Sequence, residues 1–116
     1  MATILAIHAH PDDVETLCAG TLALLAAAGH QIKIATATAG EAGSETLSPT
    51  EAAAVRIAEA TASAAVIGAD YRCIGLPDLG VFNDDAGRTA HLTVSVTARR
   101  PASSLNTPRS GNPIQR

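Results

Sequence analysis

Short apolar runs alternate with amphipathic stretches along the first three quarters of this 116-residue chain. Residues 3–8 form an apolar run without polar alternation, which predicts a buried strand. Residues 14–28 place apolar side chains at helical spacing, and Gly29 follows as a C-terminal cap. Residues 31–37 predict a second strand. Because the connections are short, we expect two parallel strands joined by a right-handed crossover helix.

The next segment repeats this order. Ser48-Pro49-Thr50-Glu51 is a capping box with proline at the first helical position. The helix that it opens is predicted to run to about Ile67, with Gly68 ending it. Residues 71–76 predict a third strand. The resulting βαβαβ order predicts an α/β fold with a parallel sheet that forms half of a doubly wound architecture.

The composition changes after residue 86. All eleven acidic residues precede this point, whereas residues 87–116 carry five arginines and no acid. Leu92, Val94 and Val96 alternate with polar residues and predict a short strand. Residues 97–116 follow no helical or strand period, and we expect them to be disordered. The chain is therefore divided into residues 1–86, which form the α/β unit, and residues 87–116, a disordered or frame-shifted tail.

Charge and composition exclude several classes of function. The net charge is −3, and no aromatic side chain accompanies the arginines of the tail, so we expect no nucleic-acid partner. No glycine-rich nucleotide fingerprint is present. No apolar run is long enough for a membrane span, and the N-terminus lacks the basic region of a signal peptide. Two cysteines are too few for a disulfide framework, so a reducing, cytoplasmic location is expected.

The first predicted strand ends in the candidate chemistry. His10 is followed by Pro11, Asp12 and Asp13. Proline holds the residue before it in an extended conformation and suits the first turn of a helix, so the two aspartates are expected at a helix start. Imidazole nitrogen and carboxylate oxygen are ligands that zinc prefers, and the second aspartate is then free to handle protons. The alternative is a simple helix cap, which requires neither the histidine nor a second acid.

Polar residues also follow the other two predicted strands. Glu41 and Asp78 should project from the same edge of the sheet as His10 and could line a pocket with it. The alternative for both is ordinary solvation of a loop. Arg56 lies on the second predicted helix, where an isolated arginine is usually part of a solvated face. His8 is expected to be either a second-shell group of the site or a core residue of the strand.

The segment Ala9-His10-Pro11-Asp12-Asp13, followed by Glu15 and Cys18-Ala19-Gly20-Thr21-Leu22, resembles the opening of the LmbE-like, or PIG-L, zinc-dependent N-acetylglucosaminyl deacetylases. Later segments are also similar to this family, and the resemblance covers about residues 3–85; these segments are Thr38-Ala39-Gly40-Glu41, Arg56-Ile57-Ala58-Glu59 and Gly75-Leu76-Pro77-Asp78. It implies a Rossmann-like three-layer α/β fold, here incomplete, and removal of an acetyl group from a small N-acetylated sugar or related amide.

The resemblance also implies roles for individual residues. His10 and Asp13 would bind Zn²⁺, or another divalent metal, and Asp12 would be the general base. Arg56, Asp78 and Glu41 match positions that touch substrate. The family's third ligand, a histidine in a later segment, has no counterpart here. The alternative is therefore a catalytically inactive fragment or a small binding domain that lacks the third metal ligand.

We predict that the chain is marginally stable and associates with itself. Parallel sheets are normally covered on both faces, and only one face has predicted helices, so the other should expose an apolar surface. Sedimentation velocity should therefore show oligomers. A strictly monomeric chain whose amides are protected from exchange through residue 116 would contradict this prediction.

Overall fold

The computed structural model of the chain describes residues 1–97. Its elements in chain order are β1 (Thr3–His8), α1 (Asp13–Leu17), α2 (Ala19–Ala27), β2 (Gln31–Thr36), the short 3₁₀ helix η1 (Glu41–Gly43), α3 (Pro49–Ala65), β3 (Asp70–Cys73) and α4 (Asp85–Thr97). The three strands form one sheet in the order β1-β2-β3, and both pairs are parallel. The predicted parallel α/β sheet is confirmed.

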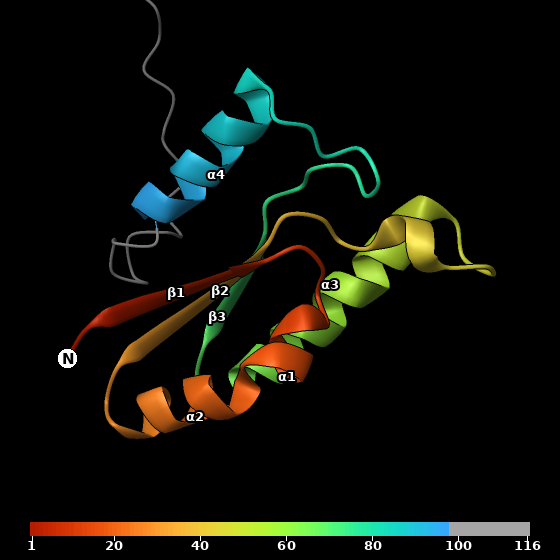
Figure 1. The fold of residues 1–116 in the computed structure, drawn as a ribbon. Helices are drawn as coiled ribbons and strands as arrows, with labels where there is room; N and C mark the ends of the chain where they lie inside the picture. Colours follow the sequence, from red (N-terminus) through yellow and green to blue (C-terminus); the bar gives the residue numbers. More distant parts are fainter. Residues whose placement is uncertain (98–116) are drawn as a thin grey trace, which may run out of the picture.

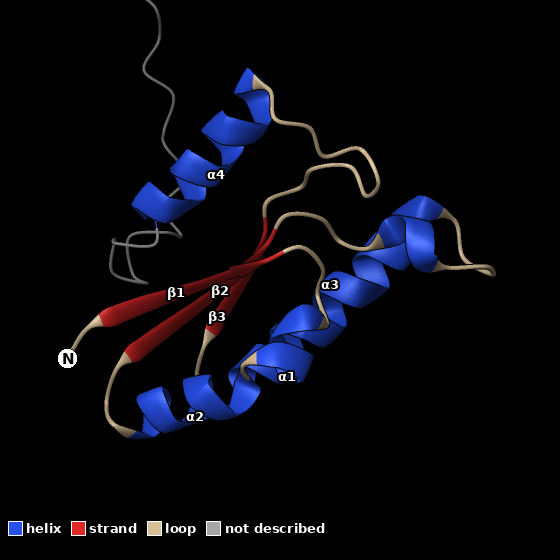
Figure 2. Cartoon of the chain, in the orientation of Figure 1, coloured by secondary structure: helices blue, strands red, loops and turns tan. Residues whose placement is uncertain are grey.

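Helices cover the sheet in layers. Figures 1 and 2 show α1, α2 and α3 on one side of the sheet and α4 on the other. The core lies between the sheet and the first three helices, where Ile32 and Ile34 of β2 pack against Val14, Leu22 and Ala64. Alanines supply every buried position of α3, so this helix can approach the sheet closely but buries little apolar area per residue.

The helix predicted over residues 14–28 is interrupted. It is two helices, α1 and α2, separated at Cys18, whose φ of −146° and ψ of 10° leave the α-helical region. The apolar pattern did not indicate this break because Val14 and Leu22, the buried residues of the two helices, still lie on one face at helical spacing. The glycine at position 20 weakens helix propensity beside the break.

The capping box of the third helix is confirmed. The Ser48 hydroxyl accepts a hydrogen bond from the Glu51 N–H, and the Glu51 side chain accepts one from the Ser48 N–H. The third strand, β3, is shorter than the predicted residues 71–76. Its pairing nevertheless continues, since the N–H groups of Ile74 and Leu76 donate to the carbonyls of Thr36 and Ala37.

The strand predicted from Leu92, Val94 and Val96 is wrong. These positions belong to helix α4. Asp84 fixes its start by accepting a hydrogen bond from the Gly87 N–H at 2.8 Å. Leu92 is largely exposed, so at this position the apolar residue of the pattern is not buried. Residues 87–97 are thus helical, and the remainder of the predicted disordered tail lies outside the described residues.

The sheet face opposite α1–α3 is covered unevenly. We predicted that it is open. On β2, however, Lys33 and Ala35 point to this side and are only 5% and 1% exposed, whereas Ile7 on β1 is 38% exposed. The prediction of an open face is therefore wrong at the central strand and right at β1, and self-association stays a prediction. Within residues 1–97, no helix is both long enough and apolar enough to cross a bilayer.

Replacing each of two glycines by alanine should change the free energy of unfolding in opposite directions. Gly68 follows α3 at a φ of +69°, where a Cβ is strained, whereas Gly20 lies within α2, and neither position has an atom near the added methyl group. Gly68→Ala should lower the free energy of unfolding by about 1 kcal/mol, and Gly20→Ala should raise it by about 0.5 kcal/mol. Urea unfolding measures both values. Equal effects would show that the two backbones do not differ as described.

Candidate metal and active site

The strand ends carry three loops to one edge of the sheet. Hydrogen bonds continue the parallel pairing beyond the strands: the Ala37 N–H donates to the His8 carbonyl at 2.8 Å, and the Thr38 N–H donates to the Ala9 carbonyl at 3.0 Å. On the other side of this loop, the Leu76 N–H donates to the Ala37 carbonyl at 2.9 Å. The residues that follow β1, β2 and β3 therefore converge, as predicted.

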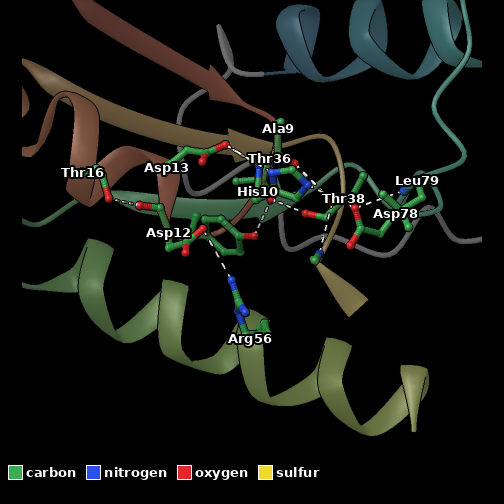
Figure 3. A network of polar contacts seen from close by, with 12 residues as sticks. Ala9, His10, Asp12, Asp13, Thr16, Thr36, Thr38, Arg56, Asp78 and Leu79 are labelled. Atoms are coloured by element: carbon green, nitrogen blue, oxygen red, sulfur yellow. Dashed lines mark hydrogen bonds and ion pairs between the residues drawn. The ribbon is translucent and has the colours of Figure 1, made fainter. Parts of the chain in front are cut away.

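His10 lies between two carboxylates. Its Nδ1 is 3.6 Å from Asp13 Oδ2, and its Nε2 is 3.1 Å from Asp78 Oδ1 (Figure 3). The backbone N–H of His10 also donates to Asp13 Oδ2 at 2.8 Å, which ties this carboxylate to the end of the strand. The imidazole of His10 therefore bridges the carboxylates of two loops, those after β1 and β3.

Asp12 does not cap the helix that it precedes. It occupies the N-cap position of α1, yet its side chain makes no capping hydrogen bond. Its carboxylate is mostly exposed, and Oδ1 lies 3.5 Å from Arg56 Nη2 (Figure 3). Helix capping therefore does not account for the aspartate at this position. Its carboxylate is open to a small molecule on one side and faces a guanidinium on the other.

Arg56 reaches Asp12 across the loop that contains Gly40. This glycine has a φ of +65°, and a Cβ built on it would lie 3.5 Å from Arg56 Nη2 and 3.5 Å from a carbon of Pro11. The position thus requires glycine for its backbone conformation, and a side chain extending beyond Cβ would compete with the guanidinium for space. Arg56 thus contacts Asp12 rather than only solvent, and its role toward a substrate stays a prediction.

Glu41 and Asp78 contact each other rather than only solvent. The Asp78 N–H donates to Glu41 Oε1 at 2.7 Å, and the Ala42 N–H donates to Asp78 Oδ2 at 3.2 Å. The other oxygen of Glu41, Oε2, is buried and has no hydrogen-bond partner among the described residues. A buried carboxylate oxygen without a partner is costly, so among the described residues this atom is the unsatisfied member of the site.

The donor set fits two corners of a zinc site. Two atoms bound to one tetrahedral zinc at about 2.0–2.1 Å lie roughly 3.3–3.4 Å apart. The 3.6 Å between His10 Nδ1 and Asp13 Oδ2 is close to this separation. Residues 1–97 contain no cluster of three or more histidine, cysteine, aspartate or glutamate side chains arranged to hold a metal. The described residues therefore bring together two side chains of a type that could bind zinc, and they do not form a complete site.

The family follows from comparison with known sequences. The model of the PIG-L family, described as GlcNAc-PI de-N-acetylase, matches residues 5–111. The chain belongs to the PIG-L family. Two relatives carry the name 1D-myo-inositol 2-acetamido-2-deoxy-alpha-D-glucopyranoside deacetylase. The protein of Nakamurella multipartita is 34% identical over 95% of this chain, and that of Actinosynnema mirum is 40% identical over 88%.

The chain covers only part of these PIG-L relatives. It spans 39% of the first and 41% of the second. Among solved structures, N,N'-diacetylchitobiose deacetylase from Pyrococcus horikoshii is similar with a TM-score of 0.73 and 27% identity, over 80% of this chain and 36% of that one. The family match also includes residues 87–111, most of the segment that its composition set apart.

Two threonines, one at the end of β2 and one after it, form a hydrogen-bond network that was not predicted from the sequence. The Thr36 hydroxyl donates to the Thr38 carbonyl at 2.8 Å and contacts the Tyr71 hydroxyl at 2.6 Å. The Thr38 hydroxyl donates to the Ala9 carbonyl at 3.2 Å and accepts from the Gly40 N–H at 3.2 Å. These bonds join the loops after β1 and β2. The one signal in the sequence is the repeated threonine at the end of β2.

His8 belongs to the core side of the sheet. Its Nε2 lies 3.5 Å from the Cys18 sulfur, at the break between α1 and α2, and both residues are half-buried. Of the two predicted roles, a core residue of the strand describes it.

Closer to the site, Asp12 and Arg56 line a pocket of about 190 Å³. Its other residues include Pro11, Glu15, Glu59 and Ser63. This is smaller than the roughly 300–1,000 Å³ of typical ligand pockets, so the described residues form only part of a wall.

Tyr71 should make folding sensitive to alkaline pH. Burial raises the pKa of its hydroxyl above the ordinary value of 10.0. The folded chain therefore holds this proton more tightly than the unfolded chain, and the associated stability is complete below about pH 10 and lost as pH rises through the raised pKa. Tyr71→Phe should flatten the alkaline part of a plot of unfolding free energy against pH.

The same shift can be read directly, because Tyr71 is the only tyrosine and the chain has no tryptophan. Tyrosinate absorbance should appear at higher pH in the folded chain than in the chain unfolded by urea. Titration at the same or lower pH in the folded chain would contradict the burial of this hydroxyl.

Proposed function

We propose that this chain supplies part of the active site of a zinc-dependent hydrolase that removes the acetyl group from an N-acetylated sugar. The observation that carries the proposal is the 3.6 Å approach of His10 Nδ1 to Asp13 Oδ2 beside the exposed carboxylate of Asp12. Membership of the PIG-L family and the names of its relatives support an acetamido sugar as the substrate.

The chemistry requires a base next to the metal ligands. His10 and Asp13 would hold the zinc ion, which would supply polarisation of the amide carbonyl and a water of lowered pKa, about 7 in such sites. Asp12 accepts a proton from the attacking water as the new C–O bond forms. It returns that proton to the nitrogen as the C–N bond breaks, so that acetate and a free amine leave. Arg56 holds the Asp12 carboxylate in place.

The remaining residues bind and orient. Arg56 lies on α3 beside Asp12, where a hydroxyl group of a sugar would meet a charged hydrogen-bond donor, and Asp78 and Glu41 order the loops around His10. Cys18 and Cys73 are free thiols, which supports a reducing compartment such as the cytoplasm. No feature of the described residues suggests a nucleic-acid partner.

The second candidate is a binding domain without catalysis. It is favoured by one observation, namely that residues 1–97 hold no third ligand beside His10 and Asp13. Catalytic zinc sites usually use three protein ligands, so a two-ligand site would bind the ion weakly. Zinc titration and turnover of the 116-residue chain separate the two candidates.

The metal assignment is tested by zinc competition with a chromophoric chelator. His10→Ala and Asp13→Ala should each weaken zinc binding by at least about 100-fold, because loss of a ligand should exceed the 10–100-fold effect of losing a supporting group. Asp70→Asn is the matched control, since Asp70 is exposed at the opposite end of β3. Equal zinc affinity of the wild type and a His10→Ala/Asp13→Ala double variant would disprove the site.

The role of Asp12 is tested by release of acetate from N-acetylglucosamine derivatives. Asp12→Asn should lower turnover by about 10²–10⁴-fold. Its zinc affinity should stay close to that of the wild type, because the residue is not a ligand. If zinc binds at His10 and Asp13 but no substrate is hydrolysed, the binding domain is the correct candidate. Turnover that survives Asp12→Asn would remove the proposed base.

A further inference from the structure

Asp78 is buried where a substrate-binding group would be expected to be open. Its side chain is only 7% exposed. Oδ1 accepts a hydrogen bond from the Leu79 N–H at 3.1 Å, and Oδ2 accepts one from the Ala42 N–H at 3.2 Å. The carboxylate is thus held by two backbone donors and has little surface left for a ligand. Its most direct contact is with His10.

The contact with Asp78 selects one form of the His10 ring. A carboxylate accepts hydrogen bonds, so the nitrogen that faces it at 3.1 Å, Nε2, must carry the hydrogen. In the neutral ring the other nitrogen, Nδ1, then has a free lone pair, and it is this atom that lies 3.6 Å from Asp13 Oδ2. The lone pair therefore points to the side on which the second proposed ligand lies.

We infer that Asp78 is a positioning residue that fixes the orientation and tautomer of His10 for metal binding, and that Glu41 holds Asp78 in that position. Histidine ligands commonly donate their second N–H to a carboxylate, which sets the tautomer and makes the ligand nitrogen more basic. This role goes beyond contact with substrate. It rests on the proposed function only where it concerns the metal.

The backbone around Asp78 is built to hold it. The Gly80 N–H donates to the Pro77 carbonyl at 3.0 Å, closing a turn in which Leu79 adopts a φ of +61°. A leucine is disfavoured in this left-handed region, because its Cβ lies too close to the following carbonyl oxygen. Leu79 is exposed and gains little from packing. The strained turn is therefore maintained by the hydrogen bonds of its neighbours, among them the one from the Asp78 N–H to Glu41 Oε1 at 2.7 Å.

The ring can be observed without any metal. In a long-range ¹H–¹⁵N spectrum of the ¹⁵N-histidine-labelled 116-residue chain, at about pH 8.5 where imidazole is neutral, His10 should show the two well-separated nitrogen shifts of a single Nε2–H tautomer. In Asp78→Ala these shifts should move toward the mixture found for a free imidazole. His30 is the internal control, because its Nδ1 accepts a hydrogen bond from the Ala2 N–H and should not change.

Zinc affinity provides the second measurement. Asp78→Ala should weaken zinc binding by about 10–100-fold. Asp78→Asn, whose amide oxygen can still accept from Nε2–H, should keep the tautomer and lose less affinity, and it serves where Asp78→Ala does not fold. Glu41→Ala should weaken binding in the same direction by a smaller factor, whereas Glu45→Ala, on the same loop and exposed, should have no effect.

The outcomes separate this inference from the proposed function. If Asp78→Ala leaves both the His10 shifts and the zinc affinity unchanged and raises only KM for the sugar, Asp78 is a substrate group and the inference is wrong. If the wild type binds no zinc, the proposed function fails, but the shifts of His10 in the two Asp78 variants still decide whether Asp78 orients the ring. Loss of the tautomer in Asp78→Ala with its retention in Asp78→Asn supports the inference.

Discussion

The parallel hydrogen-bond ladder between the strands determines where the three loops of the site lie. Pairing in register brings His8 opposite Thr36 and Thr36 opposite Cys73. The bonds then continue beyond the strands, so that the loops after β1, β2 and β3 leave the sheet side by side. Parallel strands share their carboxyl ends, whereas an antiparallel arrangement would send alternate loops to opposite ends of the molecule. The contact between His10 and Asp78, 68 residues apart in sequence, depends on this geometry.

The convergence gathers negative charge that must be balanced. Four carboxylates meet at this edge, those of Asp12, Asp13, Glu41 and Asp78. Each has a local partner: a guanidinium, the imidazole, or a backbone N–H at the end of a strand or in a turn. The exception is one buried oxygen of Glu41. Such a site has more anionic than cationic groups, so a cation bound there would relieve repulsion between the carboxylates.

The fold was largely predictable because its signals are local. Each of these signals acts on the few residues around it, as the capping box at Ser48 and the glycine at position 68 illustrate. The helix between them begins and ends close to where these signals predict. The convergence of His10, Glu41 and Asp78 was predictable because each follows a strand. The break at Cys18 was not predictable, because the buried residues on either side of it keep their helical spacing. Helix α4 was not predictable either, because its start depends on the cap that Asp84 provides. Pairwise contacts such as that between His10 and Asp78 require the completed sheet.

The close approach of Arg56 to Gly40 has a consequence for how such sequences can diverge. The two residues lie on different elements and share one small volume, since a Cβ at position 40 would already touch the guanidinium. A larger side chain in the loop would displace Arg56 from Asp12, and a shorter residue on the helix would leave room for that side chain. Positions 40 and 56 are therefore expected to change together during evolution, and neither can drift freely while the other is retained.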